Sequence, residues 1–127
     1  MRNRIVSPAV LSFCSALFLG MLAPSAHAQT AQEGKAAFAA CAGCHSVDGS
    51  AKPGPTLKGV VGRKAASVAA YRSYSSALRG SGITWTAQEL DAYLKAPATR
   101  VKGTTMMIAT PDAKRRKAIV AYLATLK

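Results

Sequence analysis

Two cysteines and a histidine stand within five residues of one another, at Cys41, Cys44 and His45. In a helical segment, offsets of three and four residues place both sulfur atoms and the imidazole on one side of about one turn. Two thiolates in this arrangement can add to the two vinyl groups of a haem, and the imidazole can then ligate the iron. The spacing therefore predicts a covalently attached haem with His45 as an axial ligand.

Three other kinds of site contain paired cysteines. A thioredoxin-like redox pair is expected among strands rich in Val, Ile and aromatic residues, and this chain has only the short pair Val60-Val61. A structural zinc site needs about four ligands, and no second cluster of Cys or His follows residue 45. A structural disulfide leaves unexplained why a histidine directly follows the second cysteine. The pattern therefore favours haem over these alternatives.

Two adjacent methionines are the candidates for a second axial ligand. Met106 and Met107 lie in a segment rich in Gly and Thr, between two helical patterns. A thioether opposite a histidine favours ferrous iron, because soft sulfur prefers the lower charge, and it raises the reduction potential. Residue type and spacing alone leave the choice between the two methionines even.

Capping patterns predict the helices that must position these residues. Residues 30–33 and 86–89 each have the form of a capping box, so one helix should begin at Thr30 and run toward Cys41, and another should begin at Thr86. Pro97 should end the second of these helices. A short helix is expected around residues 75–78. Glycines and prolines between these segments mark loops.

The C-terminal segment predicts a last helix. Thr110-Pro111-Asp112 reads as an N-cap, a first-turn proline and a first-turn acid. Ile119, Tyr122, Leu123 and Leu126 then recur at the spacing of a buried helix face, and we assign no chemistry to Tyr122 or to Tyr93 in the preceding helix. Gly34, on the apolar face of the first helix, permits close approach of another helix. The fold class is therefore all-α.

The N-terminal segment has the three regions of a secretory signal peptide. A positively charged start, an apolar run over residues 9–23 and the small-x-small triplet Ala26-His27-Ala28 follow one another. We expect export with cleavage after Ala28, which divides the chain into a signal peptide, residues 1–28, and a single domain, residues 29–127. An uncleaved N-terminal anchor is the alternative.

The chain is strongly basic. It contains 17 Lys and Arg against 5 Asp and Glu in 127 residues, and its formal net charge is +12. Removal of residues 1–28 takes away Arg2 and Arg4 and leaves a charge of +10. This length excludes large multi-domain enzymes and multi-span membrane proteins. Such charge attracts acidic partner surfaces, and it is also typical of proteins that bind nucleic acid or anionic membranes. The export signal and the lack of aromatic residues among the basic ones argue against nucleic acid.

The run Lys114-Arg115-Arg116-Lys117 concentrates positive charge on the last predicted helix. Such a run is usually the solvated face of a helix, and a docking patch is the alternative.

From about Gln32 to Leu126 the chain resembles the class I c-type cytochromes, the family that includes mitochondrial cytochrome c and its bacterial periplasmic relatives. The segments that carry the resemblance are, in chain order, Glu33-Gly34-Lys35 with Phe38, Cys41 to His45, Lys52 to Leu57 with Gly59, Val61 to Lys64, Tyr74 to Ala77, Gly82 to Trp85, Leu90 with Tyr93-Leu94 and Pro97, Gly103 to Met106 and Ile119 to Leu123. Several motifs in order are more specific than one. The resemblance implies a cytochrome c fold, in which a few helices and Gly/Pro loops wrap around one haem c bound through Cys41 and Cys44.

The resemblance also implies roles for single residues. Met106, rather than Met107, matches the axial methionine, so the metal ligands are expected to be His45 and Met106. Pro55 matches the proline whose carbonyl group orients the proximal imidazole. The positions that hydrogen-bond or pair with the haem propionates are matched by Arg63, Tyr74, Trp85 and Thr104.

The chain departs from the family at the start of the ligand loop. Lys102 stands where many relatives have proline, so the loop that carries the axial methionine is expected to be less rigid. Of the docking lysines of the family, only Lys52 is retained as a candidate.

The function implied is that of a soluble one-electron carrier in the periplasm, with no catalytic residues. We expect a monomer, not stably inserted in the membrane after cleavage, that meets acidic surfaces of redox proteins such as a membrane oxidase, reductase or dehydrogenase. Two other functions stay open. One is a haem enzyme or ligand-binding protein with a labile methionine, supported only by Lys102, and the other is a dedicated cytochrome subunit of a periplasmic dehydrogenase or oxidase.

Overall fold

Helices lie at both ends of the domain and long loops join them, in the computed structural model that describes residues 25–127. The helices are α1 (Ala26–Ala37), followed by a 3-10 turn (Phe38–Ala40), α2 (Ser76–Arg79), α3 (Ala87–Lys95), α4 (Pro97–Arg100) and α5 (Ala113–Leu123). Residues 25–127 contain no sheet, only an isolated bridge between Lys64 and Thr84. This part of the chain is all-α, as predicted. Most of the predicted signal peptide lies outside the described residues.

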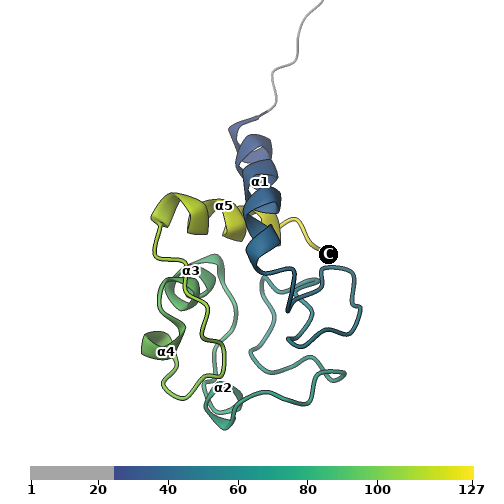
Figure 1. Cartoon of the computed structure of the whole chain (residues 1–127), viewed down its shortest axis with the longest axis vertical. Helices are drawn as coiled ribbons and strands as arrows, with labels where there is room; N and C mark the ends of the chain where they lie inside the picture. The colour runs from purple at the N-terminus through teal and green to yellow at the C-terminus, as the bar shows by residue number, and fades with distance from the viewer. Residues whose placement is uncertain (1–24) are drawn as a thin grey trace, which may run out of the picture.

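α1 and α5 cross at one end of the molecule (Figure 1). Gly34 lies at the crossing, where an added Cβ atom would be 1.9 Å from the carbonyl oxygen of Ala118 and 2.8 Å from Cβ of Tyr122. The rings of Phe38 and Tyr122 pack beside it, with their centroids 5.5 Å apart. The close approach predicted at Gly34 is therefore confirmed, because any side chain there would overlap the backbone of α5.

The predicted start of the first helix is wrong. α1 begins at Ala26, with Ser25 as its N-cap, and the hydroxyl of Thr30 donates to the carbonyl of Ala26 at 2.9 Å from inside the helix. Thr can cap only where the preceding chain leaves the helix, and the alanines before Thr30 continue it. The predicted cleavage site after Ala28 falls in the first turn of α1.

The predicted start of the last helix is also wrong, by two residues. Asp112, and not Thr110, is the N-cap of α5, and its carboxylate accepts a hydrogen bond from the backbone amide of Arg115 at 2.6 Å. The backbone amide of Thr110 instead donates to the carbonyl of Leu94 in α3, at 2.7 Å. A contact with a distant helix therefore decides which of the two capping residues begins α5.

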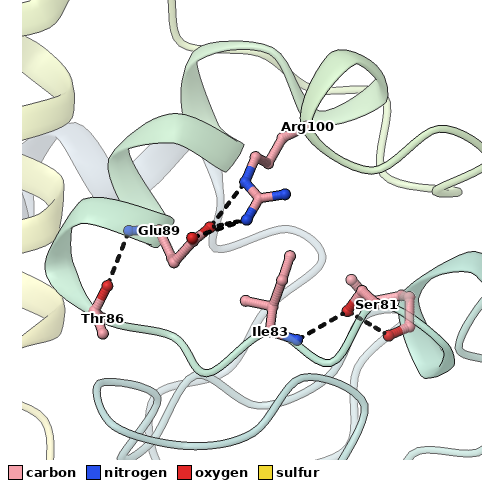
Figure 2. Close-up of polar contacts among 6 residues, drawn as sticks. Ser81, Ile83, Thr86, Glu89 and Arg100 are labelled. Atoms are coloured by element: carbon pink, nitrogen blue, oxygen red, sulfur yellow. Dashed lines mark hydrogen bonds and ion pairs between the residues drawn. The ribbon is translucent and has the colours of Figure 1, made fainter.

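The predicted helix start at Thr86 and the short helix expected around residues 75–78 are confirmed. The hydroxyl of Thr86 accepts from the amide of Glu89 at 3.1 Å (Figure 2), and the hydroxyl of Ser75 accepts from the amide of Leu78 at 3.1 Å. Pro97 follows the end of α3 as predicted, and it also opens α4 as a first-turn proline.

α5 carries the centre of the core. Ile119 and Leu123 are each 2% exposed, as the apolar stripe predicted, whereas Tyr122 and Leu126 are half-buried and Leu126 lies beyond the helix end. Ala118 and Val120 are buried as well, because α5 packs against α1 and α3. The other buried apolar residues are Phe38, Val60, Ile83, Trp85, Leu90, Tyr93, Leu94 and Val101.

The basic run on α5 is not simply a solvated face. Lys114, Arg115 and Lys117 are exposed as predicted, but Arg116 is only 6% exposed and pairs with Asp91 of α3. Among residues 25–127, no helix has the length and apolar character needed to span a membrane.

Candidate haem-binding site

The cysteines and the histidine leave α1 in one continuous turn. After the 3-10 turn, the amides of Cys44 and His45 both donate to the carbonyl of Cys41, at 3.1 and 2.9 Å. Cys41 is half-buried and Cys44 is exposed, and both are free thiols. Burial raises the pKa of the Cys41 thiol, with the positive charge of Arg115 acting in the opposite direction. The three side chains thus leave the single turn that their spacing predicted.

The imidazole of His45 is held from one side by the next loop. Its Nδ1 lies 2.7 Å from the carbonyl oxygen of Pro55. A carbonyl only accepts, so this bond requires the ring proton on Nδ1 and leaves the lone pair of Nε2 free for a metal ion. A Cβ atom on Gly54 would lie 2.7 Å from Cε1 of His45, so only glycine allows the loop to approach the ring this closely.

A cavity of about 330 Å³ brings the predicted residues together. All nine predicted site residues line it, namely Cys41, Cys44, His45, Pro55, Arg63, Tyr74, Trp85, Thr104 and Met106. Its remaining lining is mainly apolar and includes Leu57, Val60, Leu90, Leu94, Ile119 and Leu123. A lining of this kind, with few polar groups, is typical of a cofactor site.

The two methionines occupy different environments. Met106 is half-buried and packs against the core, and its amide makes a long hydrogen bond, 3.4 Å, to the hydroxyl of Thr104. Met107 also borders the cavity but is 76% exposed. Burial therefore favours Met106 as the residue that presents its sulfur to the interior.

Polar groups also belong to the cavity lining. The guanidinium of Arg63 donates to the carbonyls of Lys58 and Thr56, at 2.6 and 2.7 Å, and burial lowers its pKa. These bonds use two of the five N–H donors of an arginine, so others are left for an anion. Burial raises the pKa of Tyr74, whose ring lies edge-on to Tyr71 at 4.7 Å. A cation and a hydroxyl in a half-buried setting suit carboxylate groups such as haem propionates.

Sequence reasoning missed the polar role of Tyr93. This residue is 5% exposed, lines the cavity, and places its hydroxyl 2.5 Å from the hydroxyl of Thr104. Burial raises its pKa, and the hydrogen bond with Thr104 acts in the opposite direction. Its spacing with Leu90 and Leu94 predicted only a core position. The one available signal was that a buried tyrosine hydroxyl requires a partner.

The donor set fits a covalent haem. Two thiols, an imidazole with a free Nε2 and a thioether border one largely apolar cavity, and its lining also includes an arginine and hydroxyl groups. This combination supplies covalent attachment, both axial ligands and partners for the propionates.

Comparison with known proteins supports the same assignment. The sequence model of the cytochrome c family matches residues 31–127. The chain is 36% identical to cytochrome c2 of Blastochloris viridis over 105 residues, which cover 80% of this chain and 81% of that protein. It is 41% identical over 87 residues to the cytochrome c-type cyt cy of Rhodobacter capsulatus, where the match covers 68% of this chain but 43% of that longer protein.

A solved structure shows the fold independently. Cytochrome cH from Methylobacterium extorquens superimposes with a TM-score of 0.70 at 43% identity, over 75% of this chain and 97% of that one. The chain therefore belongs to the cytochrome c family, with one covalently bound haem c and the function of a one-electron carrier.

Proposed function

We propose that Cys41 and Cys44 hold the haem through thioether bonds and that His45 and Met106 ligate its iron. The observation that carries this proposal is the 2.7 Å contact from Nδ1 of His45 to the carbonyl of Pro55, which leaves Nε2 free in a cavity that Met106 also lines. Both thiols project from the same turn as this histidine. The three attachment residues therefore act as a unit.

The residues around the cavity set the conditions for electron transfer. The bound haem supplies a one-electron couple between ferrous and ferric iron. Apolar side chains such as Leu94 and Ile119 exclude water from the interior, which limits the reorganisation that accompanies a change of charge. The thioether of Met106 favours the ferrous state, and the carbonyl of Pro55 fixes the orientation of His45 and raises its basicity. We assign Arg63, Tyr74, Trp85 and Thr104 to the propionates.

We also propose that the protein is exported to the periplasm and cleaved after Ala28, so that residues 29–127 form the working domain. The start of the family match at residue 31 supports this boundary. The resulting charge of +10 favours brief encounters with acidic surfaces of redox proteins such as a membrane oxidase, reductase or dehydrogenase. Lys52 remains a candidate docking residue, although its ammonium group donates to the carbonyl of Ala42. We propose a monomer, because a mobile carrier needs short-lived complexes.

The experiment that tests the haem assignment is visible absorption of the exported, purified protein before and after acid–acetone extraction. Haem that stays with the protein, together with sharp bands after reduction and the weak ferric methionine-to-iron charge-transfer band, is the expected result. A Cys44→Ser variant should retain less covalent haem. Covalent haem with a high-spin ferric spectrum and no charge-transfer band would contradict ligation by Met106. Mass spectrometry of the same sample should give a chain that begins at Gln29.

A further inference from the structure

One buried charge is not explained by haem attachment. Arg116 is 6% exposed, although it stands in a run of four basic residues whose other members are exposed. It does not line the haem cavity. A buried guanidinium is destabilising unless its donors are paired, so its partners indicate what it does.

The guanidinium of Arg116 joins α5 to two other segments. Its Nε donates to Oδ1 of Asp91 in α3 at 2.9 Å. Its Nη1 donates to the carbonyl oxygens of Thr110 and Pro111, at 3.1 and 2.7 Å. Asp91 keeps 43% of its side chain exposed, so the pair is buried on the arginine side only. One side chain therefore fastens the end of the segment before α5 to two helices.

That segment carries Met106. Near its start, the hydroxyl of Thr104 lies 2.5 Å from the hydroxyl of Tyr93, and at its end the amide of Thr110 donates to the carbonyl of Leu94 at 2.7 Å. Between these two anchors, the described residues 105–109 make one hydrogen bond, the 3.4 Å contact from the amide of Met106 to Thr104. Apart from the packing of Met106 against the core, the position of this residue therefore depends on the two ends of the segment.

We propose that Arg116 is a positioning residue that holds Thr110 and Pro111 in place and thereby keeps Met106 on the haem iron. The inference rests on the proposed ligation by Met106. A planar guanidinium can bond a carboxylate and two carbonyl groups at once, whereas the ammonium group of lysine is a point charge without this fork. Lys102 is exposed at the start of the segment and stands where many relatives have proline. Because the start of the segment lacks this rigid residue, the position of Met106 depends more on the anchor at the far end.

Arg116→Lys tests the proposal, with Arg100→Lys as its matched control. Arg100 also pairs with a carboxylate of α3, Glu89, at 2.6 Å (Figure 2), but this arginine keeps 37% of its side chain exposed, and among the described residues its side chain hydrogen-bonds only to Glu89. The measurement is the rate at which imidazole displaces the methionine in the ferric holoprotein, followed by loss of the charge-transfer band. We expect displacement about tenfold faster in Arg116→Lys, because hydrogen bonds to a charged group are lost, and no change in Arg100→Lys.

A second readout separates positioning from general stabilisation. The denaturant midpoint of each holoprotein is measured alongside, and amide hydrogen exchange at Thr110 reports the anchor itself. For Arg116→Lys we expect faster exchange at Thr110 and faster displacement of the methionine, with a denaturant midpoint that changes less than these two rates do. Asp91→Asn should accelerate displacement less, because it leaves both carbonyl contacts in place. If Arg116→Lys does not assemble with haem, the Asp91→Asn variant is used for the test instead.

Equal displacement rates in wild type, Arg116→Lys and Asp91→Asn would overturn the proposal. The proposal would also fail if the acceleration of displacement in Arg116→Lys, Asp91→Asn and Arg100→Lys simply followed the decrease in denaturant midpoint, because Arg116 would then be an ordinary stabilising residue. A wild-type protein that lacks the charge-transfer band would contradict the ligation by Met106 itself, which is a separate result.

Discussion

Met106 and Met107 show how burial separates two residues of identical chemistry. Both border the haem cavity, yet Met106 packs against the core and Met107 is 76% exposed. An exposed thioether keeps its hydration and its freedom of rotation, so it gains little by remaining on the iron. Met106 is half-buried against the core, so its side chain is more restrained than that of Met107.

Matched substitutions test this difference. Met106→Ala should abolish the ferric charge-transfer band and lower the reduction potential, because the iron loses its sulfur ligand. Met107→Ala should keep the band and change the free energy of unfolding by less than about 0.5 kcal/mol, as is usual for an exposed position. Loss of the band in Met107→Ala but not in Met106→Ala would show that Met107, and not Met106, ligates the iron. Visible spectra and potentiometric titration of the two holoproteins give the answer.

The ion pair of Glu89 and Arg100 predicts part of the pH dependence of stability. The guanidinium of Arg100 donates to both carboxylate oxygens of Glu89, at 2.8 Å each, and these bonds hold the pKa of Glu89 below its ordinary value of 4.5 (Figure 2). A carboxyl group whose pKa is lowered by folding stabilises the protein above its unfolded pKa, and this stabilisation is lost as the pH falls through the folded pKa.

Glu89→Gln is therefore expected to be less stable than wild type at neutral pH and to approach it in acid. Denaturant unfolding of both holoproteins between about pH 7 and pH 3 measures the difference. Glu33→Gln, which changes an exposed carboxylate of α1, controls for the change of net charge. A difference between wild type and Glu89→Gln that stays constant across this pH range would contradict the prediction.

The crossing of α1 and α5 has a strict steric requirement at Gly34. The carbonyl oxygen of Ala118 lies where a side chain at position 34 would be, so the backbones are in direct contact. This crossing also sets the direction in which α1 delivers Cys41 to the cavity, because the 3-10 turn follows α1 without a break. Packing between the first and last helices therefore supports the haem attachment turn.

Gly34→Ala should destabilise the holoprotein by about 2 kcal/mol, since the two helices must move apart, and the better helix propensity of alanine offsets only part of this effect. Gly43→Ala is the matched control, because no atom lies within 4 Å of an added Cβ atom there and the C-x-x-C-H spacing is kept. The denaturant midpoints of the two variants, compared with that of the wild type, measure this difference in stability. Equal stability would show that α1 and α5 can separate without loss.

For the molecule as a whole, the excess of positive charge determines how it meets other molecules. The charge of +10 expected after cleavage is spread over a small domain with few acidic residues. Long-range attraction raises the rate of encounter with anions and is screened by salt over a Debye length of about 10 Å at 0.1 M. Encounter rates should therefore depend on ionic strength with opposite signs for anionic and cationic partners.

Small redox reagents test this without a protein partner. Oxidation of the ferrous protein by anionic hexacyanoferrate(III) should become slower as salt is raised from about 10 mM to 0.15 M, and oxidation by a cationic cobalt(III) phenanthroline complex should become faster. Stopped-flow absorbance measures both rates. The same salt dependence for both reagents would show that local contacts, and not net charge, control the encounter.

Much of the site followed from local patterns. The spacing of Cys41, Cys44 and His45, the cap at Thr86 and the apolar stripe of α5 each depend on neighbours within about one or two turns, so the sequence alone was enough to predict them. The resemblance to a family added the positions of Pro55 and Met106. The structure brings these residues together around one cavity.

The remaining features depend on contacts between residues far apart in the chain. The same local pattern allows Thr110 or Asp112 to cap α5, and a hydrogen bond to Leu94 in α3 decides for Asp112. A run of four charges predicts a solvated face, and only the packing of α5 beside α3 buries Arg116 against Asp91. Local sequence thus determined the turn that attaches the haem, whereas tertiary structure decided which methionine is sheltered and what holds its loop, because burial and long-range hydrogen bonds exist only once the helices have packed.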